Sequence, residues 1–346
     1  MMGEMSNTWS MPTQKPELLD WESIAAEWVR ELRGKRSRAA FSRHLGYQSN
    51  VVHRWESGTA WPTAARFLAS CARCGKDVRA AYAAFFLKAP SWLGRHEPSS
   101  PEAVAAFLQQ LQGKTTLLSL SESSGYSRYA VARWLKARAE PKLPEFLRLV
   151  EASSRRALDF IATLSDPGAL DSARAHWQRL ESLRQAAYQE TWSHAVLRAL
   201  ELADYSGRGG DNAWLGEVLG ISEAQSERAL AVLEKTGQIA RRGNRWVPLP
   251  ATAVSTGRHP ATLGILTRAW TQVALERIEQ RAPAHFGYSL FAVSRKDLRR
   301  LRDLQLEYLR EMQSIIAQSS PNECVGLLCL QLLDLRPGKG NALSAD

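Results

Sequence analysis

The chain has 346 residues, of which 45% are hydrophobic and 23% are charged, the composition of an ordinary globular protein. At about 100–200 residues per domain, this length predicts two to four domains. The formal net charge of +10 favours a polyanionic partner such as nucleic acid. No apolar run approaches the roughly 20 residues of a membrane-spanning helix, so we expect no membrane partner. Residues 1–15 lack the apolar core of a signal peptide, which predicts a cytoplasmic, nucleoid-associated protein.

Residues 37–62 carry the pattern on which the functional prediction depends. A helix with small apolar residues ends at Gly46, a residue type that tolerates the left-handed conformation after a helix. A second short helix follows, with Val52 and Trp55 three positions apart and therefore on one inward face. Gly58 then ends it. The segment predicts a helix-turn-helix.

The same residues resemble the Cro/repressor type of helix-turn-helix, in which the second helix commonly ends in a Trp-Glu-x-Gly-x-x-x-Pro phrase. Here that phrase runs from Trp55 to Pro62. The resemblance implies that the second helix enters the major groove of double-stranded DNA. It implies that the base-reading residues are Ser49, Asn50 and His53. It also implies DNA phosphate contacts for three arginines, Arg38, Arg43 and Arg54. The alternative is a helical hairpin that only packs, because this geometry also occurs in domains that bind no DNA.

The sequence also repeats itself at an offset of 79 residues, without gaps. The matched landmarks are Gly34-Lys35 with Gly113-Lys114, Gly46-Tyr47 with Gly125-Tyr126, Arg54-Trp55 with Arg133-Trp134, Pro62 with Pro141, and Phe67-Leu68 with Phe146-Leu147. Five landmarks at one offset predict two tandem all-helical domains, residues 18–88 and 102–165, joined by a turn-rich linker. The repeat also matches Cys71 with Val150, which indicates a core position for this thiol.

The second copy has diverged from the helix-turn-helix phrase. Leu135 replaces Glu56 and Ala137 replaces Gly58, so we expect the second helix to continue past this point. Its groove-facing surface is nevertheless basic, and the expected DNA phosphate contacts are Arg128, Arg133, Lys136 and Lys142. The competing interpretation is a surface that packs against the first copy or forms a dimer.

A linker helix is predicted within residues 166–190, followed by a winged helix-turn-helix in residues 191–250. The expected elements are helices over 195–203, 213–219 and 222–236 and a hairpin around 242–244. The wing carries three candidate DNA contacts, Arg241, Arg242 and Arg245. The third helix carries Glu223, Glu227 and Glu234, and because carboxylates near phosphates weaken binding, a protein-protein or architectural role is favoured here.

Residues 258–336 predict a small α+β domain for dimerisation or effector binding. The expected order is a helix over 260–280, a strand over 288–293, a long helix from Ser294 to about Gln318, and a strand over 325–335. The apolar run of the last strand suits burial on both faces or pairing across a subunit boundary. Disorder is expected at the two ends, residues 1–17 and 337–346.

This order is similar to that in a family of bacterial regulators that pair an N-terminal Cro/repressor-like domain with a C-terminal domain of unknown function. The similarity covers about residues 190–336. It implies a transcriptional regulator that dimerises through its C-terminal half, and it implies no catalytic residue and no ligand.

No enzymatic motif is recognisable in the chain. The seven histidines lack metal-ligand spacing, and neither a phosphate-binding glycine loop nor a Gly-x-Ser-x-Gly elbow occurs. The pair Cys71 and Cys74 lies in a predicted helix, and the pair Cys324 and Cys329 lies in a predicted strand, so we expect no metal and no cofactor.

The sequence therefore predicts a mainly α, non-catalytic, homodimeric DNA-binding regulator. The alternative function is a non-catalytic scaffold in which the helix-turn-helix units contact protein and the C-terminal half recruits a protein partner. A third possibility is a sensor whose ligand pocket lies in the C-terminal domain, near Trp270, Phe286, Tyr288 and Phe291.

Overall fold

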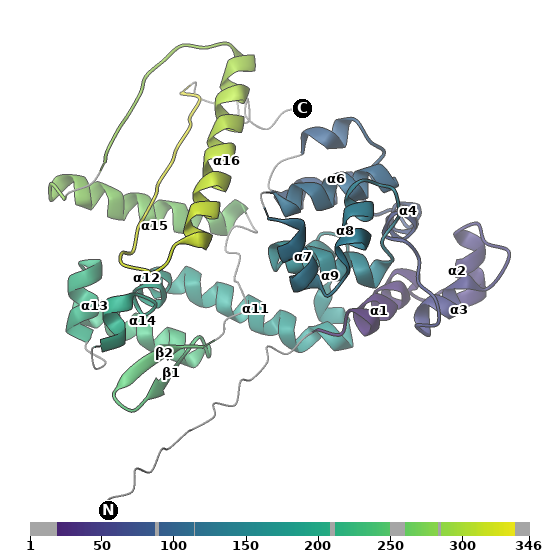
Figure 1. The fold of residues 1–346 in the computed structure, drawn as a ribbon, viewed down its shortest axis with the longest axis horizontal. Coiled ribbons are helices and arrows are strands. Elements are labelled where there is room, and N and C mark those ends of the chain that lie inside the picture. The colour runs from purple at the N-terminus through teal and green to yellow at the C-terminus, as the bar shows by residue number, and fades with distance from the viewer. Residues whose placement is uncertain are drawn as a thin grey trace, which may run out of the picture.

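The computed structural model is mainly helical (Figure 1). The residues that it describes are 19–86, 90–113, 115–207, 212–249, 260–282 and 285–335. Within them lies one sheet, which has two antiparallel strands. A mainly α fold is thus confirmed, while the disorder predicted for 1–17 and 337–346 falls outside the described residues. None of the described helices is both long and apolar enough to cross a bilayer.

The first repeat folds into five helices. They are α1 (Trp21–Arg33), α2 (Arg38–His44), α3 (Val51–Glu56), α4 (Ala64–Arg73) and α5 (Val78–Phe86). Local sequence sets three of the starts, because the side chains of Asp20, Ser37 and Thr63 accept hydrogen bonds from backbone N–H groups in the first turns of α1, α2 and α4. The two helices predicted around Gly46 are therefore present as α2 and α3.

The second repeat gives the same helix order. Its helices are α6 (Pro101–Gln112), α7 (Leu117–Ser124), α8 (Arg128–Leu135), α9 (Leu143–Ser154) and α10 (Ala157–Ala162), and the 3-10 helix η1 (Ser91–Gly94) precedes them. The expectation that the second helix continues is wrong, because α8 ends at Leu135. Ala137 adopts the left-handed conformation (φ 52°) that Gly58 has in the first repeat (φ 71°). The turn is thus kept without its glycine, at a cost of about 1 kcal/mol for the left-handed alanine.

The two repeats share a single hydrophobic core. Their contact is approximately two-fold symmetric, since Ala64 N donates to Pro141 O and Leu143 N donates to Pro62 O, both at 2.9 Å. Each residue in one bond lies 79 positions from its counterpart in the other. Five aromatic rings from both repeats meet in the interior: Tyr82, Phe85, Phe107, Phe146 and Phe160. The two predicted domains are therefore packed as one unit.

Helix α11 (Asp171–Gln189) joins this unit to the rest of the chain, after the 3-10 helix η2 (Pro167–Ala169). Its first half contributes Trp177 and Leu180 to the shared core. Its second half carries Arg184, whose buried guanidinium lies 2.7 Å from Asp159 of α10 and 2.7 Å from Glu181. This ion pair fixes α11 against the second repeat.

The elements predicted for residues 191–250 are present and have a second core of their own. They are α12 (Trp192–Ala199), the 3-10 helix η3 (Ala203–Gly207), α13 (Asn212–Leu219), α14 (Glu223–Lys235), β1 (Ile239–Arg242) and β2 (Arg245–Pro248). Ser222 and Gln225 form a capping box at the start of α14. Ile239 pairs with Pro248, and Gly243 (φ 62°) makes the hairpin turn.

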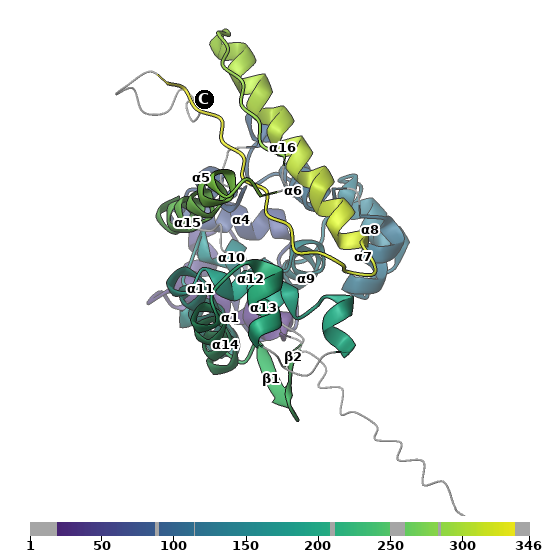
Figure 2. The same cartoon turned by 90° about the vertical axis from the view of Figure 1, so that its left-hand side faces the viewer.

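The C-terminal part differs from the prediction. Helices α15 (Pro260–Glu279) and α16 (Arg295–Gln318) are present, but the strands predicted over 288–293 and 325–335 are not, so the described residues do not form an α+β domain. Both segments run extended, without a neighbouring strand to pair with (Figure 1). In the rotated view, α16 projects from one end of the molecule and the β1–β2 hairpin from the other (Figure 2).

Candidate nucleic-acid interface

The α2–α3 hairpin is held together by a tight turn and a buried hydroxyl. Gly46 takes φ 88° between the helices, a conformation that favours glycine. The Oγ of buried Ser42 donates to the Arg38 carbonyl at 2.9 Å and accepts from Val52 N–H at 3.2 Å. Val52 and Trp55 are buried as predicted. One face of α3 is thereby fixed against the core, and the opposite face is left to solvent.

A buried carboxylate fixes the end of α3. Glu56 Oε1 lies 2.5 Å from Arg33 Nε of α1, and Glu56 Oε2 lies 2.7 Å from Arg38 Nε of α2. Burial alone would raise the pKa of Glu56, but the hydrogen bonds and charges of the two arginines outweigh it and lower the pKa below its ordinary value. Glu56 therefore stays ionised and clamps three helices. Sequence reasoning missed this role, although the glutamate belongs to the phrase that marked the motif.

The predicted base-reading residues Ser49, Asn50 and His53 are all exposed. Asn50 immediately precedes α3, and its side chain does not cap the helix. Its Oδ1 lies 3.3 Å from Ser42 Oγ, which orients the amide. His53 lies one turn further along α3, so its ring and the Asn50 amide share one open face, and Ser49 is exposed just before the helix.

The three predicted phosphate contacts near α3 are not equivalent. Arg43 and Arg54 are exposed at either end of the hairpin. Arg38 is committed through Nε to Glu56, and its Nη1 lies 3.4 Å from His53 Nδ1. Its side chain is 46% exposed, so only part of the guanidinium remains for a phosphate. The structure thus gives Arg38 a positioning role that sequence reasoning did not assign.

The corresponding surface of the second repeat is basic and open. Arg128, Arg133, Lys136 and Lys142 are all exposed. Tyr129 is 72% exposed, and the guanidinium of Arg133 lies 5.5 Å from the centre of its ring. Both interpretations of this surface, a contact with a phosphate backbone and a contact with protein, stay predictions.

The arginines predicted for a wing lie on the β1–β2 hairpin, and they are not equally exposed. Arg241 and Arg242 are exposed, whereas Arg245 is half-buried and its guanidinium lies 5.3 Å from the centre of the Tyr205 ring. Arg228 of α14 lies 3.5 Å from Glu190, a carboxylate of the preceding segment. Arg228 is thus partly neutralised by Glu190, and Arg241 and Arg242 remain the exposed cations of the hairpin.

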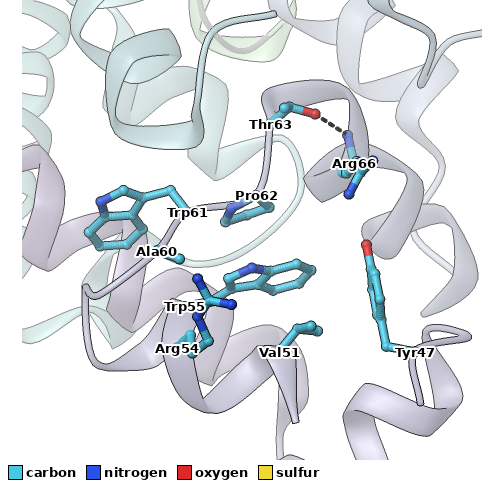
Figure 3. Close-up of a pocket in the computed structure, with 9 residues that line it drawn as sticks. All are labelled: Tyr47, Val51, Arg54, Trp55, Ala60, Trp61, Pro62, Thr63 and Arg66. Atoms are coloured by element: carbon cyan, nitrogen blue, oxygen red, sulfur yellow. Dashed lines mark hydrogen bonds between the residues drawn. The ribbon is translucent and has the colours of Figure 1, made fainter. Parts of the chain in front are cut away.

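A pocket of about 200 Å³ lies between α3 and α4 (Figure 3). Tyr47, Trp55 and Trp61 line it together with Arg54 and Arg66. The rings of Tyr47 and Trp55 meet edge to face, with centroids 5.6 Å apart. The sequence did not predict this pocket, because the spacing of aromatic residues indicates the helix face on which they lie but not which of them line a pocket.

The four cysteines are all free thiols. Cys71 is buried in α4, as its match with Val150 predicted, and burial raises the pKa of its thiol. Within the residues that the structure describes, no group of three or more His, Cys, Asp and Glu side chains is placed to hold a metal ion.

Comparisons with known proteins bear on the second half of the chain. Residues 172–335 match the family model described as Domain of unknown function (DUF4423). This range runs from the start of α11 to the extended segment after α16. No curated protein and no solved structure matches the chain. The matching description names no activity, so function has to be argued from the sites themselves.

Proposed function

We propose that this protein is a sequence-specific DNA-binding transcriptional regulator that reads DNA with α3. The observation that carries the proposal is the division of α3 into two faces. Val52, Trp55 and Glu56 are buried and clamped, while Ser49, Asn50 and His53 are exposed together. Such a helix presents fixed donors and acceptors to base edges in a major groove. Arg43 and Arg54 flank it for phosphates, and the net charge of +10 favours encounter with DNA.

The test begins with genomic footprinting of the bound full chain, followed by affinity measurements on the recovered sequence and on random duplex. His53→Ala and Asn50→Ala should each weaken binding to the recovered sequence by about 1–3 kcal/mol and leave random duplex unaffected. Arg54→Ala should weaken binding to both duplexes and flatten the salt dependence. Arg268→Ala removes an exposed cation from α15 and serves as the matched control.

Two results would contradict this proposal. Equal binding of every duplex by the parent and all three variants would show that α3 is not the reading helix. Absence of salt-sensitive DNA binding at low ionic strength would favour the scaffold alternative.

We also infer that the working form is a homodimer assembled through residues 286–335. Large apolar side chains stand open to solvent there, among them Tyr288, which is 94% exposed, and Leu290, which is 78% exposed. Within the described residues, no backbone hydrogen bond joins 286–293 to 325–335. Exposed apolar side chains on extended backbone with unpaired edges are typical of strands that pair with another chain.

Charge along α16 favours a second copy of the chain as that partner. Residues 295–302 carry five arginine and lysine residues and one aspartate, whereas residues 303–311 carry Asp303, Glu307 and Glu311 and one arginine. An antiparallel pair of α16 helices related by a two-fold axis would place these opposite charges against each other. Leu304 and Tyr308, both more than half exposed, lie on one face of the same helix and would meet in such a pair.

Light scattering of the full chain at micromolar concentration tests the dimer. The parent should have the mass of two chains, and Leu290→Asp and Leu304→Asp should have the mass of one. Leu118→Asp changes a leucine that is 50% exposed in α7 and should leave the dimer intact. A monomeric parent, or variants that stay dimeric, would refute the assignment.

A further inference from the structure

We propose that the pocket between α3 and α4 binds a small single-ring aromatic acid, and that this ligand opposes DNA binding. The inference rests on the proposed function only for its second part, because ligand binding itself can be measured without DNA. The pocket lies directly behind the proposed reading helix (Figure 3).

The second repeat provides an internal comparison for this pocket. There, Tyr126 and Trp134 meet edge to face with centroids 5.1 Å apart, as Tyr47 and Trp55 do in the first repeat. The guanidinium of Arg148 lies 5.6 Å from the centre of the Tyr126 ring and covers it. The residue 79 positions earlier is Ala69, which is too short to cover Tyr47. The aromatic surface that Arg148 covers in the second repeat is therefore left uncovered at the matching position of the first repeat.

The charges around the two surfaces also differ. Glu145 in the second repeat corresponds to Arg66 in the first, and Glu140 corresponds to Trp61. Arg54 and Arg66 are exposed and line the first pocket. Within the part of the chain that the structure describes, neither forms an ion pair with a carboxylate. Two guanidinium groups and an aromatic wall are complementary to an anion that carries a ring.

The volume limits the size of this ligand. A pocket of about 200 Å³ is smaller than the roughly 300–1,000 Å³ that drug-sized ligands occupy. One aromatic ring with a carboxylate or phosphate group fits this space, whereas a nucleotide does not. The ring would lie against Tyr47 and Trp55, and the acid group would bind Arg54 and Arg66.

Arg54 connects the pocket to DNA. The same guanidinium is proposed to contact a phosphate when α3 lies in the groove, and it cannot serve both anions fully. Ligand and DNA should therefore weaken each other's binding by the same factor, as linkage requires. A cellular aromatic acid would then release the regulator from its site.

Calorimetric titration of the full chain without DNA tests the pocket, with phenylacetate and phenyl phosphate as probes. At least one should bind with one-to-one stoichiometry, and comparing them shows which acid group is preferred. Acetate, which lacks the ring, and benzyl alcohol, which lacks the charge, should not bind. Arg66→Gln should weaken binding about tenfold, the effect of one charge-assisted hydrogen bond.

The decisive variant is Ala69→Arg, which copies Arg148 and should fill the pocket and abolish binding. Ala72→Arg adds the same charge to an exposed position of α4 and should bind like the parent. Failure of both acids to bind the parent, or binding that survives Ala69→Arg, would overturn the pocket. If a bound acid leaves the DNA affinity unchanged, the coupling is refuted but the pocket is not. If the parent does not bind DNA at all, the proposed function is refuted instead.

Discussion

Replacing Glu56 with glutamine tests whether the buried carboxylate holds α3 in place. Its two oxygens accept from Arg33 Nε at 2.5 Å and Arg38 Nε at 2.7 Å. A hydrogen bond to a charged group contributes about 1.5–3 kcal/mol. The Arg38 side chain is 46% exposed, so solvent screening reduces its share to well below that range. We expect Glu56→Gln to lower the free energy of unfolding by about 2–3 kcal/mol.

The pH dependence of the free energy of unfolding provides a second, independent test of this prediction. The folded pKa of Glu56 is lower than its ordinary value of 4.5, so the unfolded chain takes up this proton first as the pH falls. The stabilisation is therefore complete above about pH 5 and is lost as the pH falls below 4.5 through the folded pKa. The difference in stability between parent and variant should be constant near neutral pH and should shrink below pH 4.5.

Urea unfolding followed by tryptophan fluorescence measures both effects, because Trp28 and Trp55 lie in this core. Glu140→Gln removes an exposed carboxylate and should change the free energy of unfolding by less than about 0.5 kcal/mol. The reasoning fails if Glu56→Gln is as stable as the parent at pH 7, or if the difference between them persists unchanged at pH 3.5.

Four further variants test other features of the fold, and urea unfolding measures the stability of each. Ala137→Gly should raise the free energy of unfolding by about 0.5–1 kcal/mol, because it replaces an alanine in the left-handed conformation. Gly58→Ala should lower the free energy of unfolding by a similar amount. Equal stability of the parent and both variants would show that these positions are not strained. Asp159→Ala should cost about 3–5 kcal/mol because it leaves the Arg184 guanidinium buried without its main carboxylate. The double variant Asp159→Leu with Arg184→Met should cost less than Asp159→Ala, and a larger loss would show that the pair contributes more than its replacement by apolar contacts.

Sequence reasoning located the helices well where local signals and the repeat agreed. The turn at Gly46 and the start of α14 at Ser222 are set by residues within a few positions, so they could be predicted. Ala137 shows the limit of that approach. Alanine favours helix by propensity, but the packing shared with the first repeat imposes the left-handed turn.

Contacts between distant residues account for what was missed. Nothing local to Asp159 indicates that Arg184, 25 positions later, would be buried against it. The extended segments 288–293 and 325–335 have the apolar pattern of strands, yet a strand needs a partner that periodicity does not supply. The repeat matches Ala69 with Arg148, but only the contact of Arg148 with the Tyr126 ring shows what that difference means for the surface of Tyr47.

Comparing the two repeats distinguishes the residues that the fold requires from the residues that could form a binding site. The core positions are kept, with Val52 matching Val131 and Trp55 matching Trp134, and all four side chains are buried. The surface positions have exchanged charge and size, as with Arg66 and Glu145. Because the same backbone tolerates both surfaces, the helix order alone cannot assign a function to either copy. The residues that differ between the repeats give the first repeat an open aromatic pocket and the second a basic face.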